Sequence, residues 1–235
     1  MLRDVSVKAL ILSGGFGKRL RPITDYLPKP LVPIDGIPII EWQIRYFKKF
    51  GIKDFVICTG YRSDQIADHL SQKNLNVTIQ FSIEKTSLGT GGAIKNARKF
   101  LDEDDFYVIN GDVMTNLDLK KLRMQKNSIA VVPLRTAFGI VHLIGNKIEK
   151  FEEKPKISNY WINAGLYYLE KDIIKLLPKI GNIETTVFPK LAAMNSLHAA
   201  KYEKVFWCSI DSHKDIEECA KEMKAVEYDA FLSIK

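Results

Sequence analysis

A glycine-rich segment near the N-terminus carries the residue types that bind phosphate. Gly14, Gly15 and Gly17 lie in a run that reads L-S-G-G-F-G-K-R-L-R-P. Because glycine has no Cβ, the backbone N–H groups of this run can approach an anion closely. Arg19 adds a forked, permanently charged donor for phosphate oxygens, and Lys29, held between two prolines, adds a point charge. The segment is therefore predicted to bind a polyphosphate.

Two other phosphate-binding motifs do not fit this segment. A P-loop requires glycine at the position of Leu12 and Ser or Thr at the position of Arg19. A dinucleotide-binding fingerprint requires a third glycine at the position of Leu20. A glycine-rich turn with solvated cations is the alternative interpretation.

A carboxylate follows another predicted strand. The apolar residues 106–109 lead directly into Asn110, Gly111 and Asp112. A carboxylate at a strand end is a suitable ligand for Mg²⁺, which typically takes one or two carboxylates together with substrate phosphates. A simple turn is the alternative for Asp112.

The elements that position these residues alternate in the first 112 residues. Short apolar runs predict strands at 7–12, 54–59, 77–82 and 106–109, and apolar periodicity predicts helices at 39–50, from 63 and at 89–100. This alternation predicts a mostly parallel sheet with right-handed crossovers. Because ligands bind at the carboxyl ends of parallel strands, the loops 13–21, 84–92 and 110–112 are expected to converge on one crevice.

The second half is richer in strands. Strands are predicted at 129–134, 140–143, 147–152 and 163–169, and helices near 172–177 and from 185. A last helix is expected after Ser212, with Asp215 completing a capping box. The chain has no internal repeat and no hexapeptide repeat of the β-helix type, so the halves are interpreted as lobes of one domain.

Composition narrows the function classes. The 235 residues are 46% hydrophobic and carry a net charge of +7, with the cations spread along the chain. No aromatic-basic motif or zinc-like spacing indicates a nucleic-acid partner. No apolar run approaches the ~20 residues that span a bilayer, and the N-terminus does not resemble a signal peptide. Cys58, Cys208 and Cys219 form no even disulfide set, which favours a reducing cytoplasm.

Several segments together resemble the sugar-1-phosphate nucleotidyltransferase family, in particular its short mannose- and heptose-1-phosphate guanylyltransferases. The matching segments are the glycine-rich run with L-P-K-P-L after it, E-K-T-S-L-G-T-G-G-A at 84–93, N-G-D at 110–112, F-E-E-K-P at 151–155, N-A-G-L-Y at 163–167 and E-T-T-V-F-P at 184–189. The departures are Lys18, where the family usually has Thr, and Thr186, where an acid is usual.

The resemblance implies a Rossmann-like three-layer α/β/α fold with a mixed, mostly parallel central sheet. It implies one nucleotidyltransferase domain over 1–235, with a nucleotide-binding lobe at about 1–112, a sugar-phosphate-binding lobe at about 113–235 and no β-helix domain. The implied reaction is Mg²⁺-dependent transfer of a nucleoside monophosphate from a nucleoside triphosphate (NTP) to a sugar 1-phosphate, which releases pyrophosphate. The implied partners are these two substrates, with neither nucleic acid nor membrane, and a homo-oligomer is compatible with the sequence.

The resemblance also assigns the catalytic and metal-binding residues. An ungapped alignment of W-C-S-I-D-S-H-K-D at 207–215 places Ser209 at the usual second metal position. Cytidylyltransferases of the family have W-x-x-M-D-(T/S)-x-(R/K)-D instead, which the chain follows closely, so Asp211 is assigned as the second ligand beside Asp112. The implied catalytic residues are Arg19, Lys29, Asp112 and Asp211.

The substrate assignments follow the remaining motifs. Ionised Glu84 accepts hydrogen bonds only, and guanine offers N1–H and N2–H₂ side by side, which favours GTP, whereas the segment at 207–215 favours CTP. The expected nucleotide-binding residues are Leu12, Ser13, Gly14, Gly15, Gly17, Arg19, Lys29, Glu84, Gly89, Thr90 and Gly111. The expected sugar-phosphate-binding residues are Gly139, Glu153, Lys154, Asn163 and Glu184. UTP-, dTTP- or CTP-using enzymes, a choline-phosphate acceptor and a non-catalytic regulatory relative remain as alternatives.

Overall fold

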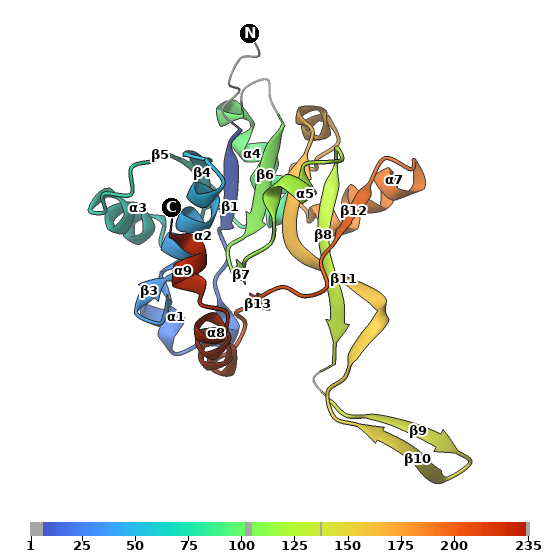
Figure 1. Cartoon of the computed structure of the whole chain (residues 1–235). Helices are drawn as coiled ribbons and strands as arrows, with labels where there is room; N and C mark the ends of the chain where they lie inside the picture. The colour runs from blue at the N-terminus through green and yellow to red at the C-terminus, as the bar shows by residue number, and fades with distance from the viewer. Residues whose placement is uncertain (1–6, 102–104, 137, 234–235) are drawn as a thin grey trace.

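A seven-stranded sheet forms the centre of the protein in the computed structural model, which describes residues 7–101, 105–136 and 138–233 (Figure 1). In spatial order its strands are β12 (His198–Lys201), β8 (Ser128–Arg135), β11 (Lys156–Leu169), β6 (Phe106–Asn110), β1 (Ala9–Ser13), β4 (Asp54–Thr59) and β5 (Thr78–Ile83). β11 runs antiparallel to both of its neighbours, and every other adjacent pair is parallel. The mixed, mostly parallel sheet predicted from the sequence is confirmed.

Helices cover both faces of the sheet because successive strand residues point to opposite sides. Ala9 and Ile11 of β1 belong to one buried cluster, which α2 (Ile39–Lys49), α3 (Ser63–Ser71) and α5 (Leu119–Leu122) complete. Leu10 belongs to a second cluster on the opposite face, with α4 (Gly89–Asn96), α6 (Ile183–Thr186) and α7 (Phe188–Ala193). The result is the expected three-layer α/β/α arrangement.

The C-terminal helices pack beside the glycine-rich segment. In α8 (His213–Ala225) the Ser212 side chain accepts from the Asp215 N–H and Asp215 accepts from the Ser212 N–H, which confirms the predicted capping box. A third buried cluster joins α8 and α9 (Tyr228–Leu232) to α2 and to the hairpin of β2 (Pro33–Ile34) and β3 (Ile37–Pro38). Leu20 of the glycine-rich segment is buried in this cluster. The C-terminal helices are thereby held against the glycine-rich segment.

Residues 13–33 contain short helical turns at Lys18–Leu20, α1 (Ile23–Tyr26) and Lys29–Leu31, none of which was predicted. A 3₁₀ helix at Lys171–Lys175 replaces the expected helix at 172–177, and another 3₁₀ turn, Ala97–Phe100, extends α4. Several short elements were not predicted, namely the strands β2, β3, β7 (Val113–Thr115), β12 and β13 (Trp207–Ser209) and the helices α5 and α9. Turns of three to five residues are too short to show an apolar period.

A two-stranded arm projects from the ends of β8 and β11 (Figure 1). It consists of β9 (Ile140–Ile144) and β10 (Lys147–Glu152), which lie where the sequence predicted strands and pair antiparallel. Phe151 pairs with Val141 and Ile148 with Leu143, so one face of the arm is apolar, and all four side chains are exposed.

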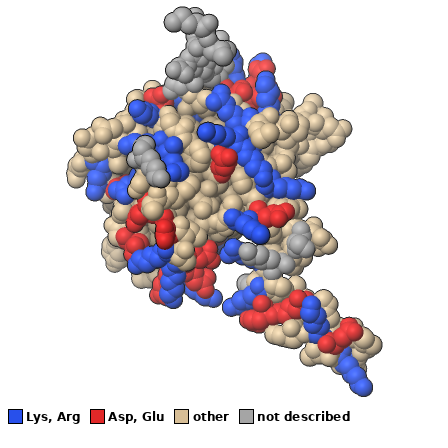
Figure 2. Space-filling model, viewed as in Figure 1, with Lys and Arg blue, Asp and Glu red and all other residues tan. Residues whose placement is uncertain are grey.

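Charges are mixed rather than segregated on the face seen in Figure 2, where lysines and arginines lie beside aspartates and glutamates on the body and on the arm. On this face the cations therefore form a solvated, mixed-charge surface and not a basic patch. Within the described residues, no helix combines the length and the apolar character needed to cross a membrane.

Candidate active site

The predicted phosphate- and nucleotide-binding segments meet at one cavity of about 360 Å³. It lies at the carboxyl ends of parallel strands, because Ser13 ends β1, Asn110 ends β6 and Glu84 follows β5. The predicted residues that line it are Leu12, Ser13, Gly14, Gly15, Gly17, Arg19, Lys29, Glu84, Gly89, Thr90, Gly111, Asp112 and Asp211.

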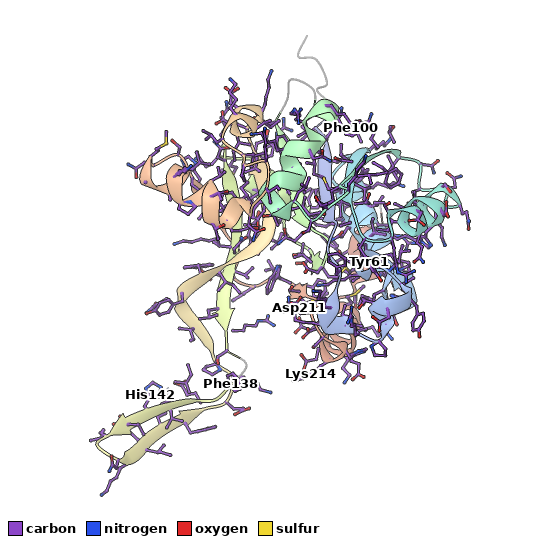
Figure 3. The ribbon with its side chains drawn as sticks, turned by 180° about the vertical axis from the view of Figure 1, so that it is seen from behind. Tyr61, Phe100, Phe138, His142, Asp211 and Lys214 are labelled. Carbon is purple, nitrogen blue, oxygen red and sulfur yellow. The ribbon has the colours of Figure 1, made fainter. Side chains whose placement is uncertain are left out.

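A small antiparallel pairing brings the two predicted metal ligands together. β7 begins directly after Asp112 and pairs with β13, with Ser209 opposite Val113. The Ile210 N–H donates to the Asp112 carbonyl oxygen at 2.9 Å, which extends the pairing to the residue before Asp211. The Asp215 carboxylate then accepts from the Asp211 N–H at 2.9 Å and holds the turn before α8. Figure 3 shows Asp211 on the body, close to the start of α8.

The two carboxylates share one ammonium group. Lys29 Nζ lies 2.8 Å from Asp112 Oδ2 and 3.1 Å from Asp211 Oδ1. Arg19 Nη2 lies 2.8 Å from the same oxygen of Asp211. Gly17, in the left-handed region at φ 61°, lets the loop turn back so that its carbonyl accepts from the Thr24 hydroxyl at 2.8 Å. This turn sets Arg19 and Lys29 on the same side of the cavity.

A divalent metal fits this pair of carboxylates. Both bind one common cation, the Lys29 ammonium, so they are directed at a shared position. Carboxylate oxygens are the hard ligands that Mg²⁺ prefers, and Mg²⁺ often has few protein ligands because substrate phosphates supply others. Among the described residues, no cluster of three or more acidic, His or Cys side chains is arranged to bind a metal.

Glu84 lies at the end of the cavity opposite Asp112 and Asp211, against the glycine-rich segment. Its N–H donates to the Thr59 carbonyl oxygen and its carboxylate accepts from the Leu88 N–H at 3.2 Å. Burial raises the pKa of the Glu84 carboxyl, and the hydrogen bond from Leu88 opposes that rise. A Cβ at Gly14 would stand 2.1 Å from Glu84 Oε1, so only glycine allows the carboxylate to occupy this place.

A hydrogen-bond chain connects the nucleotide side to predicted sugar-binding residues. The Thr90 hydroxyl donates to Glu184, whose other oxygen accepts from the Tyr167 hydroxyl at 3.1 Å. The same Tyr167 oxygen accepts from Asn163 Nδ2 at 2.8 Å. Burial and the nearby Glu184 raise the pKa of Tyr167, which keeps its hydroxyl a donor. Asn163 and Glu184 do not line the cavity themselves but reach it through Thr90.

The other three predicted sugar-phosphate residues lie at the base of the arm. A Cβ at Gly139 would stand 3.2 Å from Glu153 Oε2, and Lys154 Nζ is 4.0 Å from Glu153 Oε1. Glu152 is instead paired with Lys150 and His142, which lower the pKa of its carboxyl. Gly139, Glu153 and Lys154 do not line the cavity. The arm points away from the body in both ribbon views (Figures 1 and 3). Their role in binding the sugar phosphate stays a prediction.

Comparison with known proteins identifies the family. A family model described as nucleotidyl transferase matches residues 8–225. The chain belongs to this family.

Individual relatives agree with that membership. The chain is 39% identical over 227 residues to mannose-1-phosphate guanyltransferase 2 of Candida glabrata, across 89% of this chain and 62% of the relative. It is 37% identical over 172 residues to the D-glycero-alpha-D-manno-heptose 1-phosphate guanylyltransferase of Campylobacter jejuni, across 71% of this chain and 77% of the relative. The chain therefore spans less than two thirds of the fungal protein.

A solved structure has the same fold. HddC from Yersinia pseudotuberculosis, complexed with GMP-PN, superposes with a TM-score of 0.72 and 29% identity, over 92% of this chain and 99% of that one. The inositol-1-phosphate CTP transferase of T. maritima, at 19% identity and a TM-score of 0.73, shows the fold alone.

Asn182 and Tyr167 of this nucleotidyl transferase were given no role from the sequence. Asn182 lines the cavity, and its side-chain oxygen accepts from the Thr90 N–H at 3.2 Å. Its position after a glycine indicates only a turn. Tyr167 belongs to the N-A-G-L-Y segment but received no role, because its contact with Glu184 depends on how β11 and α6 pack.

Proposed function

We propose that this nucleotidyl transferase joins a nucleoside triphosphate to a sugar 1-phosphate and releases pyrophosphate, with Mg²⁺ as its metal. GTP is the favoured nucleotide, and a mannose- or heptose-type 1-phosphate is the favoured acceptor. The observation that carries the proposal is the convergence of Arg19, Lys29, Asp112 and Asp211 beside a glycine-rich loop in one cavity. The names of the two guanylyltransferase relatives support the choice of guanine and of the sugar. The free cysteines support a cytoplasmic location.

The chemistry requires charge neutralisation more than acid–base catalysis. An oxygen of the sugar phosphate attacks the α-phosphorus of the triphosphate, and the bond to the β-phosphate oxygen breaks, so that pyrophosphate leaves. The attacking oxygen is already anionic, and no general base is needed. Asp112 and Asp211 would hold Mg²⁺, which neutralises phosphate charge when it is bound. Arg19 and Lys29 bind the remaining phosphate oxygens, and backbone N–H groups of the glycine-rich loop orient the triphosphate.

Residues on two sides would position the substrates. Glu84 accepts from guanine N1–H and N2–H₂, which a single carboxylate can bind together. Asn163 and Glu184 bind sugar hydroxyls from the Tyr167 side. Lys154 neutralises the sugar phosphate, with Glu153 beside it on the arm.

The proposal is tested by a screen for pyrophosphate release. GTP, UTP, CTP and dTTP are each combined with mannose-, heptose- and glucose-type 1-phosphates and with phosphocholine, in the presence of Mg²⁺. We expect pyrophosphate only when a nucleotide and a sugar 1-phosphate are both present, with the highest kcat/KM for GTP. If no combination releases pyrophosphate, the proposed reaction is contradicted. Pyrophosphate release with phosphocholine alone would contradict the proposed acceptor.

Gly14→Ala is expected to weaken GTP binding with little effect on stability. The new methyl group would displace the flexible Glu84 carboxylate, because a Cβ at this position would stand 2.1 Å from Glu84 Oε1. We expect KM for GTP to rise about tenfold. Gly15→Ala is the matched control, because its Cβ would meet no protein atom within 4 Å. Steady-state kinetics and thermal unfolding of both variants check the prediction. An equal rise of KM in both variants would mean that the loop backbone, not Glu84, is responsible.

A further inference from the structure

The cations and anions of the candidate active site neutralise one another within the protein. Lys29, only 14% exposed, is hydrogen bonded to both Asp112 and Asp211. Arg19 makes a second ion pair with Asp211. Each of the two carboxylates is about 30% exposed, so neither is fully solvated. These ion pairs are therefore stronger than pairs on an open surface, because less water screens them.

The same four side chains are those that the two ligands require. In the described lining of the cavity, Asp112 and Asp211 supply the only carboxylates apart from Glu84 at its far end. Arg19 and Lys29 are the cations closest to those carboxylates, and a triphosphate needs them. Any metal that both carboxylates bind must compete with the ammonium group that they already bind. A triphosphate must likewise compete with the carboxylates for that ammonium group.

We propose that Lys29 acts as an internal counter-ion that blocks the metal site until a triphosphate draws it away. The inference rests on the proposed function, since it assumes a metal and a triphosphate as ligands. Binding is an exchange of partners: Lys29 moves from carboxylate to phosphate, and the carboxylates become available to the metal. Each ligand thus promotes binding of the other by the same factor, as linkage requires. Lys29 is in this respect a positioning residue as well as a phosphate ligand, and the protein without nucleotide binds metal weakly.

The test measures metal affinity without nucleotide. Mn²⁺ binding to the full chain is measured by calorimetry and electron paramagnetic resonance for wild type, Lys29→Met and Lys18→Met. Lys18 is the matched control, because it lines the same cavity and its replacement removes the same charge. Among the described residues, Asp112 and Asp211 pair with Lys29 and not with Lys18. We expect Lys29→Met to tighten Mn²⁺ binding about tenfold or more, and Lys18→Met less than about threefold, because only Lys29 occupies both carboxylates.

Further variants keep the result decisive. Adding Asp112→Asn to Lys29→Met must remove the gain, because the gain depends on that carboxylate. Lys29→Gln replaces Lys29→Met if the latter does not fold, as judged by thermal unfolding. Unchanged Mn²⁺ affinity in the Lys29 variant, equal gains in the Lys29 and Lys18 variants, or a gain that survives Asp112→Asn would each overturn the inference.

The outcome is separable from that of the proposed reaction. Mn²⁺ binding is measured without nucleotide or sugar, so it does not depend on turnover. A wild-type protein that releases pyrophosphate while Lys29→Met gains no affinity would contradict the counter-ion role alone. If the wild-type protein is inactive on all substrates but Lys29→Met binds Mn²⁺ more tightly, the result would contradict the proposed reaction alone.

Discussion

Asp112→Asn and Asp211→Asn are each expected to lower kcat for pyrophosphate release about a thousandfold, the equivalent of about 4 kcal/mol in the activation barrier. Asparagine keeps the shape of the side chain but removes the negative charge that would hold Mg²⁺ against the triphosphate. The fold should persist, since both carboxylates are partly exposed and Lys29 keeps the other carboxylate as a partner in each variant. Initial rates at saturating GTP, sugar 1-phosphate and Mg²⁺, with thermal unfolding curves, measure both effects.

Asp25→Asn is the matched control for this prediction. Asp25 lies near the glycine-rich loop and pairs with Arg21 at 3.0 Å, but it does not line the cavity. Its replacement removes the same charge and should leave kcat within about twofold, as expected for an exposed pair. Full Mg²⁺-dependent activity in Asp211→Asn would show that Asp211 is not a metal ligand and that the assignment by resemblance is wrong.

The half of the site that follows β1, β5 and β6 could be predicted from sequence. β1 and β6 are short apolar runs and β5 alternates polar and apolar residues, and parallel strands place their following loops at one edge of the sheet. Ser13, Glu84 and Asp112 could consequently be assigned to one crevice before their distances were known. The pattern is local, and local patterns are what a single sequence expresses well.

The half of the site that carries Asp211 could not be derived in this way. β7 and β13 have three residues each and lie far apart in the chain, so no periodicity indicates that they pair. Resemblance to a second form of the motif selected Asp211 over Ser209. In the structure Asp211 lines the cavity and Ser209 ends β13, with its hydroxyl 3.4 Å from Asp211 Oδ2.

β11 shows a different limit. A strand was predicted over 163–169, but the strand runs from Lys156 to Leu169. Its register against β8 shifts between Ile157 and Trp161 and again between Asn163 and Tyr167. Each shift interrupts the alternation of side chains, which is one of the signals that identify a strand in sequence. The position of the arm residues relative to the cavity depends on these irregularities, so it could not be predicted from the sequence either.

Glu84→Gln is expected to change which nucleotide the enzyme uses. Guanine presents two adjacent donors, and the carboxylate has an acceptor oxygen for each. Glutamine offers one oxygen and one NH₂ group, so a donor would face a donor. We expect kcat/KM for GTP to fall about 30- to 100-fold, the equivalent of about 2 to 3 kcal/mol, and kcat/KM for UTP, CTP and dTTP to change much less. Competition among the four nucleotides measures this ratio directly.

The pH dependence separates base recognition from a structural role. Because burial raises the pKa of Glu84, its carboxylate takes up a proton at a higher pH than an ordinary glutamate, and GTP recognition is lost as pH falls through that pKa. Glutamine does not titrate, so the ratio of kcat/KM values for GTP in wild type and in Glu84→Gln should shrink toward acid pH. The titration of the triphosphate itself affects both proteins and cancels in this ratio. Glutamine can still accept from the Leu88 N–H, which preserves the local structure. An equal loss for all four nucleotides, with no pH dependence of the ratio, would mean that Glu84 supports the loop at 84–92 and does not read the base.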